Sequence, residues 1–146
     1  MFRGRRPAIQ LKTAEQIELM RAAGLLVGRT LELLRDAVRP GISTLDLDTL
    51  AEGHIRDGGG VPSFKGYYGF TGTICASINE EIVHGIPRPD KVLRDGDVIS
   101  VDCGAIVEGW HGDAAITVPV GEITAARRRL LEVTEASMNR DRKSVV

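Results

Sequence analysis

The segment 97–118, DVISVDCGAIVEGWHGDAAITV, constrains the fold more than any other part of the sequence. Apolar and polar residues alternate on both sides of a glycine-containing turn, which is typical of a β-hairpin. We expect strands over about 97–106 and 110–119. Each strand carries one aspartate among apolar residues, Asp102 in the first and Asp113 in the second.

The spacing of these aspartates predicts that they share one face of the sheet. With a two-residue turn centred at 107–108, Ile106 faces Gly109, and in the same register Asp102 faces Asp113. Directly opposed residues of antiparallel strands have Cβ atoms about 4.5–5.5 Å apart. We therefore expect the two carboxylates to meet, provided that no bulge shifts the register.

Two carboxylates at this distance are costly in an apolar setting unless something compensates for their charge. They could share one proton, bind a cation, or pair with arginines or lie at an exposed edge. The segment VISVDCGA looks like the aspartic-protease pattern, although Cys103 stands where that pattern has a hydroxyl residue. The residues alone leave these explanations open.

Helices surround the hairpin in the sequence. Apolar or small residues recur every three or four positions over 13–38, and Thr13 with Gln16 forms a capping box at its start. We expect a second helix from Ser43 or Thr44 to a glycine stop at 58–60, a strand over 73–79, and a last helix from near residue 124. Tightly joined strands are antiparallel, so the fold class is α+β.

The glycine-rich segment 58–72 separates the second helix from the first strand. Its four aromatic side chains favour burial over a free linker, and they are Phe64, Tyr67, Tyr68 and Phe70. His84 lies in the next loop, NEEIVHGIPRP. His54 lies on the second helix without a visible partner motif, and we interpret it as an exposed or hydrogen-bonded structural residue.

The composition excludes some classes of function. With 19 Lys and Arg against 20 Asp and Glu, the net charge of −1 gives no electrostatic case for nucleic acid or an anionic membrane. No apolar run approaches the length of a membrane span. The basic start of the chain lacks the apolar core of a secretory signal, and Cys75 and Cys103 lack a CxxC spacing, so we expect a cytoplasmic protein with reduced thiols.

Two segments, CASINEEIVHGIP and RDGDVISVDCGAIVEGWHGDAAIT, resemble type I methionine aminopeptidases of the pita-bread metallopeptidase family. The resemblance implies the first half of a pita-bread fold, with an antiparallel sheet and helices packed on one face. It implies a cytoplasmic metalloprotease that is monomeric at full length and removes the N-terminal methionine from nascent proteins. Its partners would be N-terminal Met peptides, with no specific nucleic acid and no membrane.

The resemblance also implies the residues of the site. Asp102 and Asp113 match ligands of two divalent metal cations of the Co, Mn, Fe or Zn class. His84 matches the catalytic histidine that contacts the substrate and helps to stabilise the tetrahedral intermediate. The pocket for the methionine side chain would be lined by Phe64, Tyr67, Phe70 and Cys75. We expect Cys103 to point away from the metal face, and His111 to be a supporting or packing residue.

The chain departs from the family after Asp113. The family's other ligands, one histidine and two glutamates, come from a second half, and no later residue of this chain fits them. We therefore expect the 146-residue chain to be inactive by itself. Two rival hypotheses are a relative of the Xaa-Pro aminopeptidase or prolidase type, and a pita-bread protein that only binds a partner.

We expect three parts in the chain. Residues 1–12 form a basic tail, and 13–138 form the N-terminal half of the aminopeptidase catalytic domain. Residues 139–146 are interpreted as a non-native tail of a truncated reading frame, because DRKSVV is what a common sequencing-adapter sequence encodes.

Overall fold

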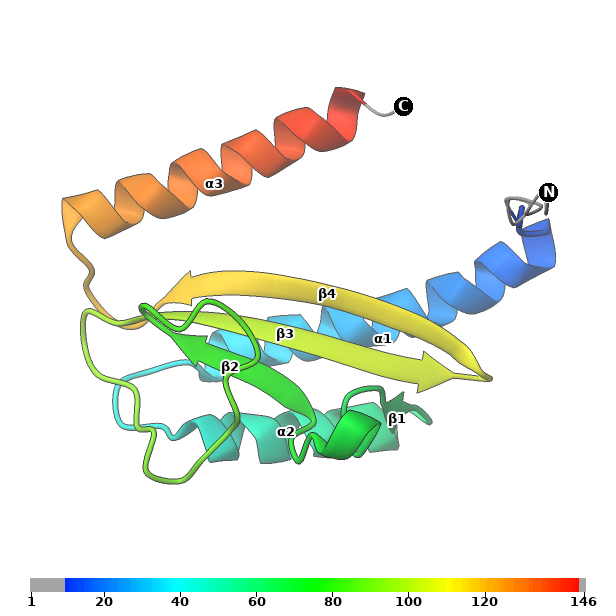
Figure 1. Ribbon diagram of the computed structural model, residues 1–146, viewed down its shortest axis with the longest axis horizontal. Helices are drawn as coiled ribbons and strands as arrows, with labels where there is room; N and C mark the ends of the chain where they lie inside the picture. The colour runs from blue at the N-terminus through cyan, green and yellow to red at the C-terminus, as the bar shows by residue number, and fades with distance from the viewer. Residues whose placement is uncertain (1–9, 145–146) are drawn as a thin grey trace, which may run out of the picture.

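The computed structural model describes residues 10–144 (Figure 1). Residues 1–9 of the expected basic tail and residues 145–146 of the expected non-native tail lie outside the described residues. Two helices come first, then a sheet of four strands, then a third helix. The elements are α1 (Ala14–Ala37), α2 (Thr44–Asp57), β1 (Val61–Pro62), the 3₁₀ turn η1 (Tyr67–Gly69), β2 (Ile74–Ile78), β3 (Val98–Val107), β4 (Trp110–Pro119) and α3 (Ala125–Ser144).

The first two helices each begin with a capping box. The Thr13 hydroxyl accepts the N–H of Gln16 at 3.2 Å, and the Gln16 side chain accepts the N–H of Thr13 at 3.0 Å. Ser43 and Asp46 repeat this reciprocal arrangement at the start of α2. The predicted capping box at Thr13 is confirmed, because these bonds satisfy backbone donors that a helix start otherwise leaves without partners.

Strand β3 is the centre of the sheet. It pairs with β4 along its whole length, and β2 and β1 pair with successive parts of its other edge, all antiparallel. Alternate residues of β3 point toward the helices and are completely buried, namely Ile99, Val101, Cys103 and Ala105. The other residues of β3, Asp102 among them, point to the opposite face.

The hydrophobic core lies between this sheet and the first two helices. Leu31 and Leu34 of α1 and Leu47 of α2 are buried in one cluster with the inward residues of β3. Helices α1 and α2 therefore cover the same face of the sheet, as Figure 1 shows. The predicted α+β class, with helices packed on one face of an antiparallel sheet, is confirmed.

The N-terminal part of α1 is less buried than the rest of its predicted apolar face. Ile17 and Met20 are 53% and 39% exposed, and burial begins only at Ala23. Figure 1 shows the reason, because the first turns of α1 run past the turn that joins β3 to β4. The helical periodicity predicted the helix correctly. It could not predict that the sheet is shorter than the helix and leaves its first turns uncovered.

Helix α3 lies apart from the sheet in Figure 1. None of its described side chains is buried, and Leu130 and Met138 are 65% and 60% exposed. The Arg127 guanidinium donates a hydrogen bond to the Gly96 carbonyl near the start of the helix. Residues 139–144 continue the helix, and their non-native origin stays a prediction. Within residues 10–144, no helix is long and apolar enough to cross a membrane.

Candidate metal centre and substrate pocket

The β3–β4 turn sets the register of the two aspartates. Val107 pairs with Trp110, so the two turn residues are Glu108 and Gly109. Their φ angles are +49° and +82°, and positive φ at both positions is the geometry of a type I′ hairpin turn. The predicted turn at 107–108 is wrong by one residue, because glycine takes the second turn position and does not follow the turn.

This register places the aspartates diagonally across the hairpin. Asp102 pairs with Ala115, and Asp113 pairs with Gly104. The expected direct opposition of Asp102 and Asp113 is therefore wrong. The expected shared face is correct, because Gly104 and Asp102 are two residues apart on one strand and point the same way. The two carboxyl groups interact, because Asp113 contributes to the raised pKa of Asp102.

The electrostatics of the pair favour a proton or a cation between the carboxylates. Partial burial, and then the negative charge of Asp113, raise the pKa of Asp102, while His84 opposes the shift. Among the described residues, neither aspartate forms an ion pair with a lysine or arginine. Pairing with arginines is thus excluded for residues 10–144. Asp113 is exposed on the edge strand β4, so contact with water, a shared proton or a bound cation can each relieve the repulsion.

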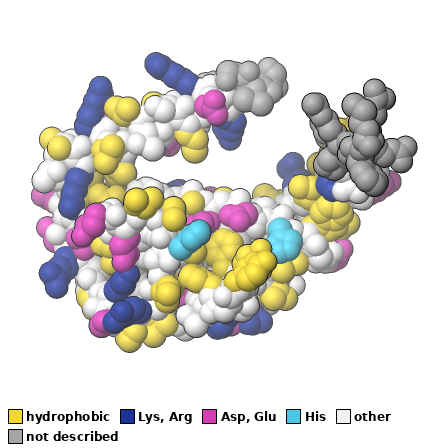
Figure 2. All heavy atoms as spheres, viewed as in Figure 1, with side chains coloured by type: hydrophobic (Ala, Val, Ile, Leu, Met, Phe, Trp, Pro, Cys, Tyr) yellow, Lys and Arg dark blue, Asp and Glu magenta, His cyan; other side chains and the backbone are white. Residues whose placement is uncertain are grey.

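One pocket of about 550 Å³ opens on this face of the sheet. Its lining contains all seven residues that the sequence analysis named for the site: Phe64, Tyr67, Phe70, Cys75, His84, Asp102 and Asp113. Tyr68 and Gly69 also line it and were not assigned to the site. Figure 2 views this side of the molecule and shows hydrophobic side chains gathered there between two histidines, with acidic side chains close by.

A glycine in β3 makes room for the aromatic part of the pocket. A Cβ atom on Gly104 would lie 2.8 Å from the Phe64 ring and 2.9 Å from the Ser63 Cβ, closer than such atoms approach. Phe64 therefore packs on β3 at Gly104, the residue that pairs with Asp113 of β4. Because Gly104 has no side chain, the Phe64 ring can pack beside the two carboxylates.

The two tyrosines of the pocket are exposed, contrary to the expectation of burial. Tyr67 is 67% exposed and Tyr68 is 94% exposed, with their rings edge to face at 4.6 Å between centroids. Both stand on the turn η1, where Gly66 and Gly69 adopt positive φ angles. The turn holds them at the rim of the pocket, outside the core.

The two cysteines point to opposite faces. Cys75 is paired directly with Asp102 and lines the pocket, and burial together with the Asp102 and Asp113 charges raises its pKa to about 11. Cys103 points into the core, where burial raises its pKa to about 12. Both are free thiols, and the expected packing of Cys103 away from the carboxylates is confirmed. A thiol with so high a pKa is a poor nucleophile at neutral pH.

The three histidines have different surroundings. His84 lies in the loop after β2 with φ at +59°, lines the pocket, and interacts electrostatically with Asp102. His54 contacts the Thr30 hydroxyl at 2.9 Å, as expected of a hydrogen-bonded structural residue. His111 is exposed on the face that carries Asp113 and contacts the Ser63 hydroxyl at 3.1 Å, so it is not a packing residue.

The donor set suits part of a divalent-metal site. Carboxylate oxygens are good ligands for such ions, and a cation would offset the two effects that raise the pKa of Asp102, partial burial and the Asp113 charge. Within residues 10–144, however, no group of three or more His, Cys, Asp or Glu side chains is placed to hold a metal. The described residues thus offer two of the four to six ligands that such ions take.

Comparisons with known proteins agree with this arrangement. The sequence model of metallopeptidase family M24 matches residues 18–145. The chain is 53% identical over 129 residues to a methionine aminopeptidase of Clostridium acetobutylicum, covering 88% of this chain and 52% of that protein. A crystal structure of methionine aminopeptidase from Thermotoga maritima superposes with a TM-score of 0.87 at 39% identity, covering 90% of this chain and 53% of that one.

Proline-specific peptidases share the fold at lower similarity. Proline aminopeptidase P II from Yersinia pestis superposes with a TM-score of 0.73 at 26% identity, covering 88% of this chain and 28% of that chain. The chain thus spans about half the length of the methionine aminopeptidases that it matches.

Proposed function

The chain belongs to metallopeptidase family M24, and from this we propose that it is part of a metal-dependent methionine aminopeptidase. The reaction is removal of the N-terminal methionine from nascent proteins. One observation carries the proposal: Asp102 and Asp113 share a face that opens into a pocket also lined by His84. Because the chain spans about half of its relatives, the activity is proposed for a complete protein with a second half.

In this proposal Asp102 and Asp113 hold two divalent cations of the Co, Mn, Fe or Zn class. The chemistry that such cations supply is a lower pKa for water and a polarised scissile carbonyl. A cation held by the two aspartates would favour their ionised form, because it would offset the Asp113 charge that, after partial burial, raises the pKa of Asp102. The remaining ligands would come from the second half.

His84 is proposed as the catalytic residue that contacts the substrate. Its imidazole can donate a hydrogen bond to the carbonyl oxygen that gains negative charge during attack on the peptide bond. Such a bond strengthens as the charge develops, so it stabilises the transition state more than the bound substrate. The position of His84 in the same pocket as the two aspartates supports this role.

The aromatic wall is proposed to bind the methionine side chain. Phe64, Tyr67 and Phe70 present aromatic surface to the pocket, and Cys75 adds a small thiol beside them. A thioether makes favourable contacts with aromatic ring edges, and an unbranched side chain fits an irregular apolar space. These features favour methionine over a charged or branched first residue.

The experiment that tests the proposal compares two peptides. A complete protein that contains this chain is assayed with divalent metal for release of methionine from a Met-Ala peptide and for cleavage of an Xaa-Pro peptide. We expect methionine release with the first substrate, abolished by Asp102→Asn. Cleavage of the Xaa-Pro peptide alone would favour a prolidase-type relative, and activity on neither would favour a partner-binding protein.

The 146-residue chain alone is proposed to be inactive, because the described residues supply only two carboxylates for two cations. Loss of groups that merely support metal ligands costs about 10–100-fold in affinity or activity, and loss of ligands costs more. Calorimetric titration with Mn²⁺ tests this expectation. Tight binding of two ions, with turnover above a metal-only blank, would contradict it. A cytoplasmic location and a monomeric complete protein stay predictions.

A further inference from the structure

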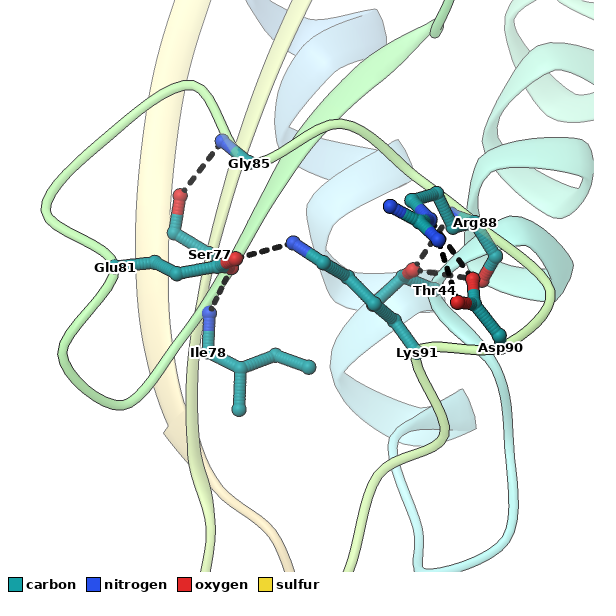
Figure 3. Close-up of polar contacts among 8 residues, drawn as sticks. All are labelled: Thr44, Ser77, Ile78, Glu81, Gly85, Arg88, Asp90 and Lys91. Carbon is teal, nitrogen blue, oxygen red and sulfur yellow. Dashed lines mark hydrogen bonds and ion pairs between the residues drawn. The ribbon is translucent and has the colours of Figure 1, made fainter.

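The loop that carries His84 joins β2 to β3 without a helix or strand of its own. His84 has a φ angle of +59°, a backbone conformation that is costly for residues with a side chain. Such a conformation persists only when its surroundings hold it. Figure 3 shows the polar contacts that join this loop to β2 and to the start of α2.

The residue directly after His84 is fixed against β2. The Gly85 N–H donates to the Ser77 hydroxyl at 3.1 Å, and the Gly85 carbonyl accepts the N–H of Ala76 at 2.8 Å. A Cβ atom on Gly85 would lie only 2.2 Å from the Ala76 carbonyl oxygen, so the backbones touch. The position of His84 therefore depends on this contact.

Glu81 connects the two ends of the same loop. One of its carboxylate oxygens accepts the N–H of Ile78, the last residue of β2, at 3.0 Å. The other oxygen accepts a hydrogen bond from the Lys91 ammonium in a partly buried ion pair, as Figure 3 shows. A carboxylate oxygen of Glu81 also lies 3.0 Å from the Cβ position of Gly85. The Glu81 side chain thus lies directly against the backbone of Gly85, the residue that follows His84.

The backbone of Lys91, whose side chain pairs with Glu81, is itself hydrogen-bonded to the start of α2. Its carbonyl accepts the N–H of Thr44 at 2.9 Å, and Thr44 is completely buried at the start of α2. The Thr44 hydroxyl also accepts the N–H of Arg88 at 2.9 Å. The ion pair between Arg88 and Asp90 is different, because it is more than half exposed and joins two neighbours at the far end of the loop.

We propose that Glu81 is a positioning residue for His84: by binding Ile78 and Lys91 together, it holds the loop so that the imidazole faces the two aspartates. The inference rests on the proposed function for its purpose, because His84 needs a fixed position only if it acts on a substrate. Its geometry can be tested without metal or peptide. A failure of the proposed function is then distinguishable from a failure of the inference.

The test uses NMR on the 146-residue chain with Glu81→Gln, which keeps an oxygen for the Ile78 N–H and removes the charge that pairs with Lys91. We expect the backbone order parameters of His84 and Gly85 to fall from near 0.85 to below about 0.6. We expect hydrogen exchange of the Gly85 amide to become at least about tenfold faster. Exchange at Val101 in the core should stay within about twofold, which separates positioning from general stabilisation.

Four further variants complete the test. Lys91→Gln should reproduce the effect, the double variant should be no worse than either single one, and Lys91→Arg, which keeps the cation, should behave as the parent chain does. Asp90→Asn is the matched control, because it breaks the exposed pair on the same loop. The inference is overturned if Glu81→Gln and Lys91→Gln leave Gly85 exchange as in Asp90→Asn, or if they accelerate exchange at Val101 equally.

The proposed function is tested separately, by the methionine-release assay on a complete protein that contains this chain. A failure of that assay counts against the proposed function alone, because the metal-free order parameters of the 146-residue chain decide independently whether Glu81 positions the loop.

Discussion

Replacement of Asp48 separates two contributions to folding stability, one from the hydrogen-bond-accepting oxygen of this side chain and one from its negative charge. Asp48 lies on α2 and is 5% exposed, and one of its oxygens, Oδ1, accepts the backbone N–H groups of Thr73 at 2.6 Å and Ile74 at 2.9 Å. This carboxylate fixes the start of β2 to the helix. Burial raises the pKa of Asp48, although the two N–H donors act against the shift.

The structure gives different magnitudes for two substitutions. Asp48→Ala leaves two buried N–H groups without a partner, and each costs about 1–3 kcal/mol, so we expect a loss of about 2–6 kcal/mol in the free energy of unfolding. Asp48→Asn keeps an Oδ1 that can accept both bonds, with its NH₂ group turned away. It gives up charge assistance but also avoids burying a charge, so we expect a change within about 1 kcal/mol at pH 7.

The dependence on pH has a definite sign. The pKa of Asp48 is raised in the folded state, so the folded state binds this proton more tightly than the unfolded state, whose pKa is near 3.9. The resulting stability is present below about pH 4 and is lost as the pH rises through the raised value. Asparagine does not titrate. The stability of Asp48→Asn relative to the parent chain should therefore improve as the pH rises from 4 to 7.

Urea unfolding followed by circular dichroism at pH 4, 5.5 and 7 measures these differences. Asp57→Asn, on the exposed end of the same helix, is the control and should change stability by less than about 0.5 kcal/mol. The reasoning is refuted if Asp48→Asn is as destabilised as Asp48→Ala at pH 7. It is also refuted if the relative stability of Asp48→Asn falls as the pH rises.

Three other substitutions test close contacts and the hairpin turn by thermal unfolding. Gly85→Ala places a Cβ atom 2.2 Å from the Ala76 carbonyl oxygen, and we expect a loss of about 1–3 kcal/mol with release of the loop. Gly112→Ala places a Cβ atom 2.6 Å from the carbonyl group of Ala23 in α1, and we expect about 2–3 kcal/mol of destabilisation because backbone opposes backbone. Glu108→Asn should stabilise the hairpin by about 0.5–1 kcal/mol, because asparagine tolerates the φ of +49° better than glutamate.

A control substitution at a glycine without close neighbours separates the effect of a steric contact from the general effect of replacing glycine. Gly28→Ala lies on exposed helix surface with no atom within 4 Å of the new Cβ, and it should stabilise by about 0.5–1 kcal/mol. Equal effects of Gly28→Ala and Gly112→Ala would contradict the contact with α1. A Gly85→Ala protein as stable as the parent chain, or a destabilised Glu108→Asn protein, would show that the local geometry is misjudged at those positions.

The local sequence pattern was sufficient to predict the two strands of the hairpin but not the register in which their residues pair. Alternation predicted both strands of the hairpin and the shared face of Asp102 and Asp113, because a two-residue period decides which way a side chain points. The pairing was wrong because glutamate is an unusual first residue for a type I′ turn, so the pair Glu108–Gly109 was not recognised as that turn.

Contacts between distant parts of the chain gave no local signal. Asp48 sits among leucines on an amphipathic helix, and its partners at the start of β2 are fixed only when the helix packs on the sheet. The same holds for Glu81, whose importance comes from Lys91 on the far side of the loop. The placement of His84 beside the aspartates came from the family resemblance, because a loop residue has no periodicity to predict its direction.

The diagonal pair of aspartates has a consequence for the order of folding. Asp102 and Asp113 lie on the two strands of one tight hairpin, and isolated hairpins form in about 1–10 μs. Their carboxylates can thus meet while both are still in water, where unit charges 4 Å apart repel by only about 1 kcal/mol. The repulsion grows later, when Phe64 packs against Gly104 and the hairpin docks on the helices, because partial burial then reduces the contact of Asp102 with water.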